Sequence, residues 1–164
     1  MKILIACVGN IFLGDDGFGV EVASRLAFKT LPPGVTVQDF GIRGFDLAYA
    51  LMEPYNQVIL VDACARGFEP GTVFLLEPDP LDETQAGLDL HGMNPLNVLR
   101  MVKSLGGTAA RVLIVGCEPG GLESENDGQF GLSKPVEAAV DEAIALIESL
   151  VSRVLDGEPA YFVN

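Results

Sequence analysis

Carboxylate and imidazole side chains stand at three places in this 164-residue chain where a loop is expected. Asp15 and Asp16 close a glycine-rich stretch, Asp62 follows an apolar run, and His91, the only histidine, lies in a long polar segment. If the strands before Asp16 and Asp62 are neighbours in a parallel sheet, their carboxyl ends meet at one edge. Carboxylate and imidazole together suit zinc, nickel, iron or manganese. The pattern therefore predicts a divalent-metal site.

The glycine-rich stretch before these carboxylates has the spacing of a phosphate-binding loop but the wrong charges. Gly9 and Gly14 are separated by four residues, as in a P-loop, which continues with Lys and Ser or Thr. Here Asp15 and Asp16 follow, and two carboxylates repel a phosphate and attract a cation. The stretch also lacks the G-x-G-x-x-G pattern of dinucleotide-binding proteins. A nucleotide-binding α/β protein is therefore the disfavoured alternative.

Each candidate residue also has a purely structural interpretation. An Asp near a helix N-terminus often caps that helix, and an Asp after a buried strand often accepts hydrogen bonds from loop amides. A lone histidine is often a surface or packing residue. Cys64 lies close enough to Asp62 in sequence to form a Cys/His pair with His91, but nothing around it lowers a thiol pKa. The chain has no G-x-S-x-G nucleophile elbow.

Hydrophobic periodicity predicts an α/β fold, a three-layer αβα sandwich with a mostly parallel five-stranded sheet. The expected strands are 2–8, 35–40, 57–61, 72–76 and 111–115, and the expected helices are 17–29, 45–52, 95–105 and 134–154. About ten residues join the third and fourth strands, too few for a parallel crossover, so we expect that edge strand to pair antiparallel. Ser133 is the expected N-cap of the last helix. Residues 1–164 are expected to form a single domain.

Composition limits the classes of partner and the compartment. With 23 Asp and Glu against 10 Lys and Arg, the net charge is −13, which argues against nucleic acid or an anionic membrane as a partner. No apolar run approaches the roughly 20 residues needed to span a bilayer. Three scattered cysteines form no disulfide framework, and buried hydrophobic positions are the default for them. We expect a cytoplasmic protein, and a monomer.

The chain resembles the nickel–iron hydrogenase maturation proteases. The run from Gly9 to Gly19 is similar to their opening signature, in which Gly-Asn precedes an Asp followed by Asp or Glu and then Gly. The similarity continues through Gly41-Ile42-Arg43-Gly44-Phe45-Asp46-Leu47, Val61-Asp62-Ala63, Pro70-Gly71-Thr72, the loop histidine, and Gly131-Leu132-Ser133 with Val136-Glu137. The matching residues span most of the chain in the same order.

The resemblance implies an endopeptidase that removes a C-terminal extension from the precursor of a hydrogenase large subunit after nickel insertion. By position, the family's nickel ligands fall on Asp16, Asp62 and His91, with Asp16 standing where some members carry Glu. The nickel is then supplied by the substrate, and other divalent metals can substitute. Asp15 is expected to be a cap or a supporting residue.

Two questions about the reaction stay open from sequence. The metal can polarise a carbonyl group or a water molecule, or Asp16 or Asp62 can act as a general base while the metal positions the substrate. Gly41 and Gly44 would let a substrate tail approach the backbone, and Arg43 would meet its carboxylate or form a surface salt bridge. A non-catalytic nickel chaperone or sensor on the same fold is the alternative function.

Overall fold

The computed structural model describes residues 1–78, 95–106, 110–120 and 130–158, without the side chains of residues 95 and 96. Its strands are β1 (Ile3–Val8), β2 (Val35–Gly41), β3 (Gln57–Ala63), β4 (Val73–Leu76) and β5 (Arg111–Cys117). Its helices are α1 (Phe18–Leu26), α2 (Gly44–Leu51), α3 (Pro95–Ser104) and α4 (Lys134–Leu155), with a 3₁₀ turn, η1, over Gly14–Gly17.

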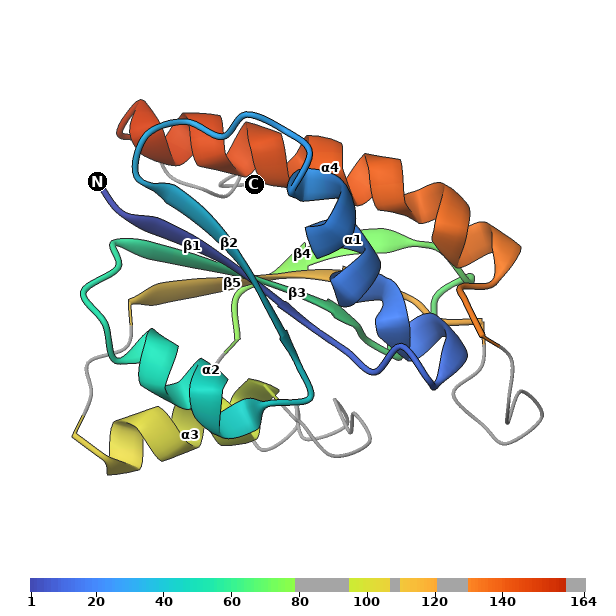
Figure 1. The fold of residues 1–164 in the computed structure, drawn as a ribbon, viewed down its shortest axis with the longest axis horizontal. Helices are drawn as coiled ribbons and strands as arrows, with labels where there is room; N and C mark the ends of the chain where they lie inside the picture. The colour runs from blue at the N-terminus through green and yellow to red at the C-terminus, as the bar shows by residue number, and fades with distance from the viewer. Residues whose placement is uncertain (79–94, 107–109, 121–129, 159–164) are drawn as a thin grey trace.

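The five strands form one mixed sheet in the order β2-β1-β3-β5-β4 (Figure 1). Neighbouring strands pair in parallel except β4, which pairs antiparallel with β5 at one edge. The predicted antiparallel edge strand is confirmed, and so is the α/β fold class with its mostly parallel sheet. The connection from β3 to β4 contains no helix and is too short for a parallel crossover, which agrees with the antiparallel direction of β4 beside β5.

Helices cover both faces of the sheet, so the predicted three layers are present. Helices α1 and α4 lie on one face, and α2 and α3 lie together on the other (Figure 1). Every residue of β1 and of β3 is buried, which is why both read as continuous apolar runs rather than alternating ones. Along β1, Ile3, Ile5 and Cys7 pack under α1 and α4, while Leu4, Ala6 and Val8 pack under α2.

The first helix differs from its predicted bounds at both ends. It was expected over residues 17–29, but α1 runs from Phe18 to Leu26. The residues before it form the tighter turn η1, which contains Asp15 and Asp16. The hydrophobic pattern could not separate a 3₁₀ turn from the start of an α-helix, because both bury residues at similar spacing.

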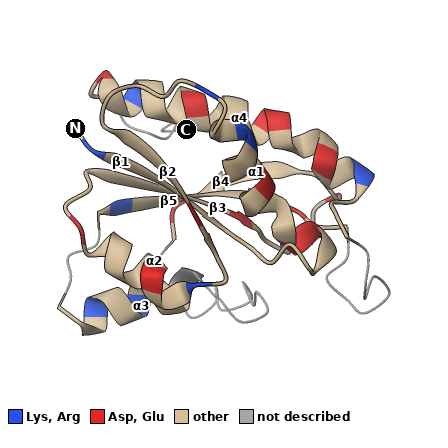
Figure 2. Ribbon diagram, in the orientation of Figure 1, with Lys and Arg blue, Asp and Glu red and all other residues tan. Residues whose placement is uncertain are grey.

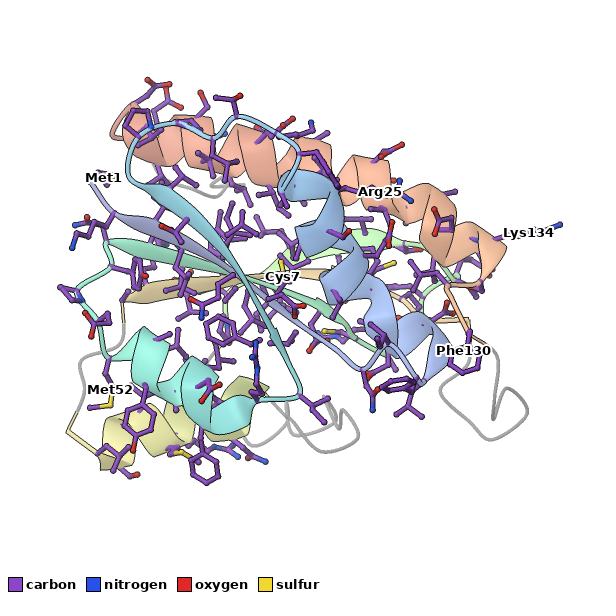
Figure 3. The ribbon with its side chains drawn as sticks, viewed as in Figure 1. Met1, Cys7, Arg25, Met52, Phe130 and Lys134 are labelled. Carbon is purple, nitrogen blue, oxygen red and sulfur yellow. The ribbon has the colours of Figure 1, made fainter. Side chains whose placement is uncertain are left out.

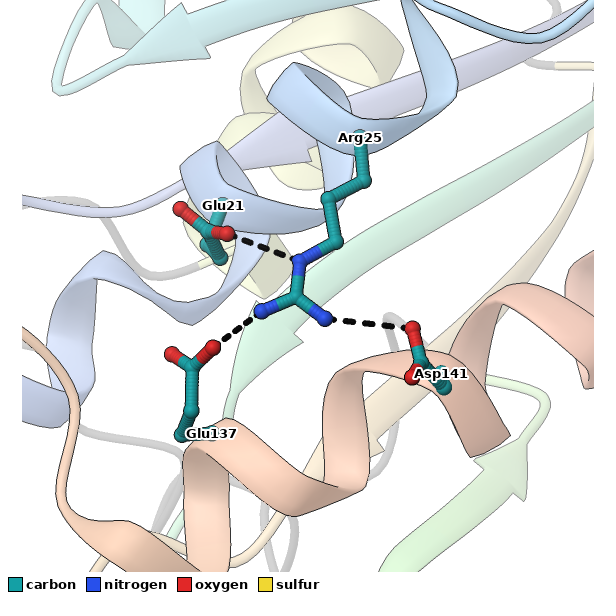
Figure 4. A network of polar contacts seen from close by, with 4 residues as sticks. All are labelled: Glu21, Arg25, Glu137 and Asp141. Carbon is teal, nitrogen blue, oxygen red and sulfur yellow. Dashed lines mark hydrogen bonds and ion pairs between the residues drawn. The ribbon is translucent and has the colours of Figure 1, made fainter.

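An ion-pair cluster joins α1 to α4 (Figure 4). Arg25 of α1 is bonded to Glu21 one turn earlier, at 2.8 Å, and to Glu137 and Asp141 of α4. Acidic residues recur along α4 and Glu21 lies on α1 (Figure 2), so Arg25 offsets part of the repulsion between these carboxylates. Among the helices that the structure describes, none is both long enough and apolar enough to cross a membrane.

Candidate active site at the carboxyl ends of β1 and β3

The sheet order brings the two predicted carboxylates to one edge. Strand β1 lies between β2 and β3 and is parallel to both, so the residues that follow β1 and end β3 meet at the carboxyl edge of the sheet. Asp16 lies in η1 after β1, and Asp62 is the next-to-last residue of β3. This edge is where ligands bind in open α/β sheets.

Asp16 is buried and held by the loop that precedes it. Asp16 is only 5% exposed. The backbone N–H of Asn10 donates to Asp16 Oδ2 at 2.8 Å, which folds the loop after β1 back over η1. The carboxylate is therefore fixed in place by a backbone donor rather than free to rotate.

Asp62 is the more unusual of the two carboxylates. It is 2% exposed, and its Oδ2 atom has no hydrogen-bond partner among the residues that the structure describes. Burial raises the pKa of Asp62 well above its ordinary value, the nearby charge of Asp16 raises it further, and a hydrogen bond from Ala63 N–H lowers it. A buried carboxyl group whose pKa is raised by burial and by a neighbouring carboxylate forms a site that stabilises a proton or a cation.

Two glycines of the opening signature make this arrangement possible. A side chain at Gly9, which has a φ of +144°, would come within 2.0 Å of the carbonyl oxygen of Asp16. A side chain at Gly19 would come within 2.2 Å of the Val8 carbonyl oxygen and 2.5 Å of the Val61 carbonyl oxygen. The first glycine lets η1 fold against the end of β1, and the second lets α1 cross the ends of β1 and β3 at close range.

Asp15 has a different role from its neighbour and links distant segments. Its carboxylate accepts hydrogen bonds from Gly120 N–H at 2.7 Å, from Ser133 N–H at 2.6 Å and from the Ser133 hydroxyl at 2.9 Å. The prediction that Asp15 is a cap or supporting residue agrees with these contacts, but the helix whose N-terminus it binds is α4, not α1. Ser133 occupies the N-cap position of α4, yet its side chain makes no capping bond because its hydroxyl donates to Asp15.

One buried carboxylate at this edge was not singled out from the sequence. Glu118 follows β5 and is buried, and it accepts hydrogen bonds from Arg66 N–H at 2.7 Å and Gly67 N–H at 3.1 Å. It thereby fixes the loop that leaves β3 just after Asp62. The available signal was its position directly after an apolar strand, the same signal that identified Asp62.

The three cysteines are buried and free, as predicted. Burial is the main cause that raises the pKa of each thiol, to about 12 for Cys117 and well above the ordinary value for Cys64. The charge of Asp62 adds to the effect at Cys64. None of these thiols is activated as a nucleophile, so the Cys64/His91 alternative loses its physical basis.

The predicted substrate-contacting turn lies beside β1. Gly41 ends β2 with a φ of +53° and accepts a hydrogen bond from Gly9 N–H at 3.0 Å, and Gly44 begins α2. Arg43 Nε donates to the Phe40 carbonyl oxygen at 3.0 Å and lies 3.6 Å from Asp46 Oδ2. The salt-bridge interpretation of Arg43 is the one that these contacts match.

His91 lies outside the described residues, so the third predicted ligand is not tested. Within residues 1–78, 95–106, 110–120 and 130–158, no group of three or more His, Cys, Asp or Glu side chains is placed to hold a metal ion. The described part of the site is a carboxylate pair, Asp16 with Asp62.

Comparison with known proteins identifies the family to which this chain belongs. A family model described as hydrogenase maturation protease matches residues 20–150. A Methanocaldococcus jannaschii protein that is named as a hydrogenase maturation protease is 39% identical to this chain over 150 residues. The match covers 88% of this chain and 93% of that protein. The hydrogenase expression/formation protein HupD of Rhizobium leguminosarum is 31% identical over 156 residues, covering 90% of this chain and 75% of HupD.

A solved structure agrees over nearly the whole length. The hydrogenase maturating endopeptidase HybD from E. coli superposes with a TM-score of 0.73 at 28% identity, covering 96% of this chain and 94% of HybD. The sequence resemblance, the sheet order and the carboxylate pair at the ends of β1 and β3 thus point the same way. The chain belongs to the hydrogenase maturation protease family.

Proposed function

We propose that this protein is the endopeptidase that removes the C-terminal extension of a nickel–iron hydrogenase large-subunit precursor, and that it acts after nickel has entered that precursor. The observation that carries the proposal is the buried Asp62 carboxylate, whose Oδ2 atom lacks a partner among the described residues, beside Asp16. The family membership gives the protease activity, and the carboxylate pair gives the reason for a metal requirement.

The donor set fits a divalent ion. Two acidic side chains that disfavour each other's ionisation lose that repulsion when a cation lies between them. Asp16 and Asp62 would bind the ion, and His91 is the proposed third ligand, although it lies outside the described residues. Carboxylate and imidazole ligands suit nickel, and zinc or another borderline metal can take the same place. Because the ion belongs to the precursor, it is part of the substrate rather than a resident cofactor.

The two carboxylates have different environments, which suggests a division of roles. Asp16 Oδ2 already accepts the Asn10 N–H, so Asp16 is suited to orienting the bound group. Asp62 Oδ2 is the carboxylate oxygen suited to accept a proton from the attacking water and return it to the leaving nitrogen. When bound, the ion would supply positive charge that polarises the scissile carbonyl group. Burial keeps bulk water away from the proton held on Asp62.

Cleavage of purified precursor tests this function. The protein is mixed with nickel-loaded and with nickel-free precursor, and loss of the extension is followed by mass spectrometry. Cleavage of the nickel-loaded form alone is expected, and Asp16→Asn, Asp62→Asn and His91→Ala should each reduce the rate at least about a hundredfold. Asp156→Asn, at the far end of α4, is the matched control and should leave the rate unchanged.

The same experiment separates the alternative of a non-catalytic nickel chaperone or sensor. That alternative predicts nickel binding by the isolated protein and no product fragment from either precursor. Equal cleavage of both precursor forms, or full activity in Asp62→Asn, would contradict the proposed role of the pair. We also propose that the protein works as a monomer in the cytoplasm, where three free cysteines would stay reduced.

A further inference from the structure

Exposed apolar side chains lie on loops next to the carboxylate pair. Five residues, here called the apolar rim, lie on the loops that follow β1 and β2 and on the segment before α4. All five are exposed, and they are Ile11, Phe12, Leu13, Ile42 and Phe130. The loops at the carboxyl ends of the strands thus bring apolar residues from three parts of the chain to one edge of the sheet.

Two contacts hold parts of the rim together. The rings of Phe12 and Phe130 meet edge to face with centroids 6.3 Å apart, although 118 positions separate them in the chain (130 − 12). Phe130 lies beside the loop that leads into η1 (Figure 3). At the other side, Gly9 N–H donates to the Gly41 carbonyl oxygen, which holds Ile42 next to the start of the same loop.

The rim is joined directly to the buried carboxylates. Asn10, which precedes Ile11, donates its N–H to Asp16 Oδ2. The backbone N–H of Asp16 donates in turn to the Leu13 carbonyl oxygen at 3.2 Å. The loop that exposes Ile11, Phe12 and Leu13 is therefore the same loop that holds Asp16 in place.

Exposure alone would not mark this surface, because single exposed hydrophobic residues are common on soluble proteins. Phe28, for example, is 91% exposed just beyond the end of α1, at the opposite edge of the sheet. What distinguishes the rim is that its members lie on loops next to the carboxylate pair and that Phe12 and Phe130 contact each other. Apolar surface gathered in this way is typical of protein–protein contact. The charge beside Ile42 is paired, since Arg43 lies 3.6 Å from Asp46, so the rim suits an apolar partner rather than a charged one.

We propose that the apolar rim is the docking surface for an apolar patch of the hydrogenase large-subunit precursor that adjoins its C-terminal extension. This inference rests on the proposed function and adds the chemistry by which the partner is held. The rim touches the precursor outside the scissile bond, so its contacts are the same before and during the reaction. Loss of a rim side chain should then raise KM and leave kcat unchanged.

The test replaces one rim residue from each side with a small polar residue. Phe12→Ser and Ile42→Ser are each expected to raise KM for the nickel-loaded precursor about tenfold. Phe28→Ser removes a still more exposed phenylalanine, just beyond the end of α1, and should leave KM unchanged. Because all three side chains are exposed, the variants should keep the melting temperature of the parent protein within about 2 °C.

A binding measurement keeps the result independent of catalysis. The same substitutions are placed in an Asp62→Asn background, and Kd for the precursor is measured by biolayer interferometry. Weaker binding by the rim variants alone supports the inference, even if the parent protein cleaves nothing and the proposed function fails. Binding that is equal in the rim and Phe28→Ser variants, or no binding of precursor by any of them, overturns the inference.

Discussion

At the scale of single residues, adjacent aspartates of the opening signature have opposite roles. Asp15 is satisfied by three donors, all from the segments around Gly120 and Ser133. Asp16 faces Asp62 and raises the pKa of that carboxyl. Asp15 is therefore a structural carboxylate that holds loops together, whereas Asp16 is the one that we propose acts with Asp62.

Replacing Asp62 with Asn should increase stability while removing activity. In the folded protein the pKa of Asp62 is raised above the ordinary value of 3.8, so the folded state binds its proton more tightly than the unfolded state does. Stability therefore falls as the pH rises from about 4 through the raised pKa, and Asp62→Asn avoids this loss. We expect its melting temperature at pH 7 to be about 2 to 5 °C above the parent's.

The difference between the two proteins should disappear below about pH 4, where Asp62 is protonated in both the folded and unfolded states. Differential scanning calorimetry from pH 3.5 to pH 8 measures this dependence. Asp156→Asn, which changes a carboxylate outside the site, should follow the parent curve. A lower melting temperature for Asp62→Asn at pH 7 would mean that the carboxylate is stabilised by contacts beyond those described.

Removing the Asp15 carboxylate should be strongly destabilising. Asp15→Ala leaves three donors unsatisfied, two of them backbone N–H groups, and should reduce the free energy of unfolding by about 2 to 4 kcal/mol. Ser133→Ala removes only the hydroxyl donor and should cost about 1 kcal/mol. Urea denaturation measures both. In the double variant the two losses should not add, because both changes remove the same hydrogen bond.

At the scale of elements, the position of α1 over the sheet depends on a single small residue. Gly19 lies in the first turn of α1 where the helix passes the carbonyl groups of Val8 and Val61. Both atoms belong to the backbone of fully buried strands, so neither can shift without disturbing the sheet. The glycine therefore sets the distance between the helix layer and the strands that carry Asp16 and Asp62.

Gly19→Ala should reduce the free energy of unfolding by about 2 to 4 kcal/mol, although alanine is the better helix former. Gly106→Ala is the contrasting control, since a side chain there would meet open space and only its φ of +79° is unfavourable. That substitution should cost about 1 to 2 kcal/mol. Urea denaturation measures both, and equal losses would show that close packing against β1 and β3 contributes little.

At the scale of the whole molecule, the net charge of −13 opposes folding through mutual repulsion. Raising the salt from about 0.01 M to about 0.15 M shortens the Debye length from about 30 Å to about 8 Å, which screens this repulsion. We expect the melting temperature to rise by about 2 to 4 °C at neutral pH. Thermal unfolding followed by circular dichroism at a series of salt concentrations measures the change.

An Arg25→Gln variant provides the comparison for this experiment. Salt also weakens attractive pairs, and Arg25 holds three carboxylates between α1 and α4 (Figure 4). Without that attractive cluster, the variant should start at a lower melting temperature and gain more from added salt. A melting temperature of the parent protein that falls with salt would mean that its ion pairs outweigh its net repulsion.

The sequence by itself determined the order of elements, the antiparallel edge strand and the carboxylates at the ends of β1 and β3. Those features depend on local information: apolar periodicity, the length of one connection, and acidic residues placed directly after apolar runs. The bounds of α1 were predicted less well, because the turn η1 and a helix start share the same pattern.

The family resemblance already favoured Asp16 as the partner of Asp62, but only the tertiary structure decided what Asp15 binds. Asp15 reaches donors at Gly120 and Ser133, more than 100 positions away, and no local pattern reports a contact across that distance. The same holds for the Ser133 hydroxyl, which leaves its own helix to bond Asp15. The sequence shows which residue types stand at the strand ends. The partner of each carboxylate is decided only when β1, β3 and the start of α4 pack together.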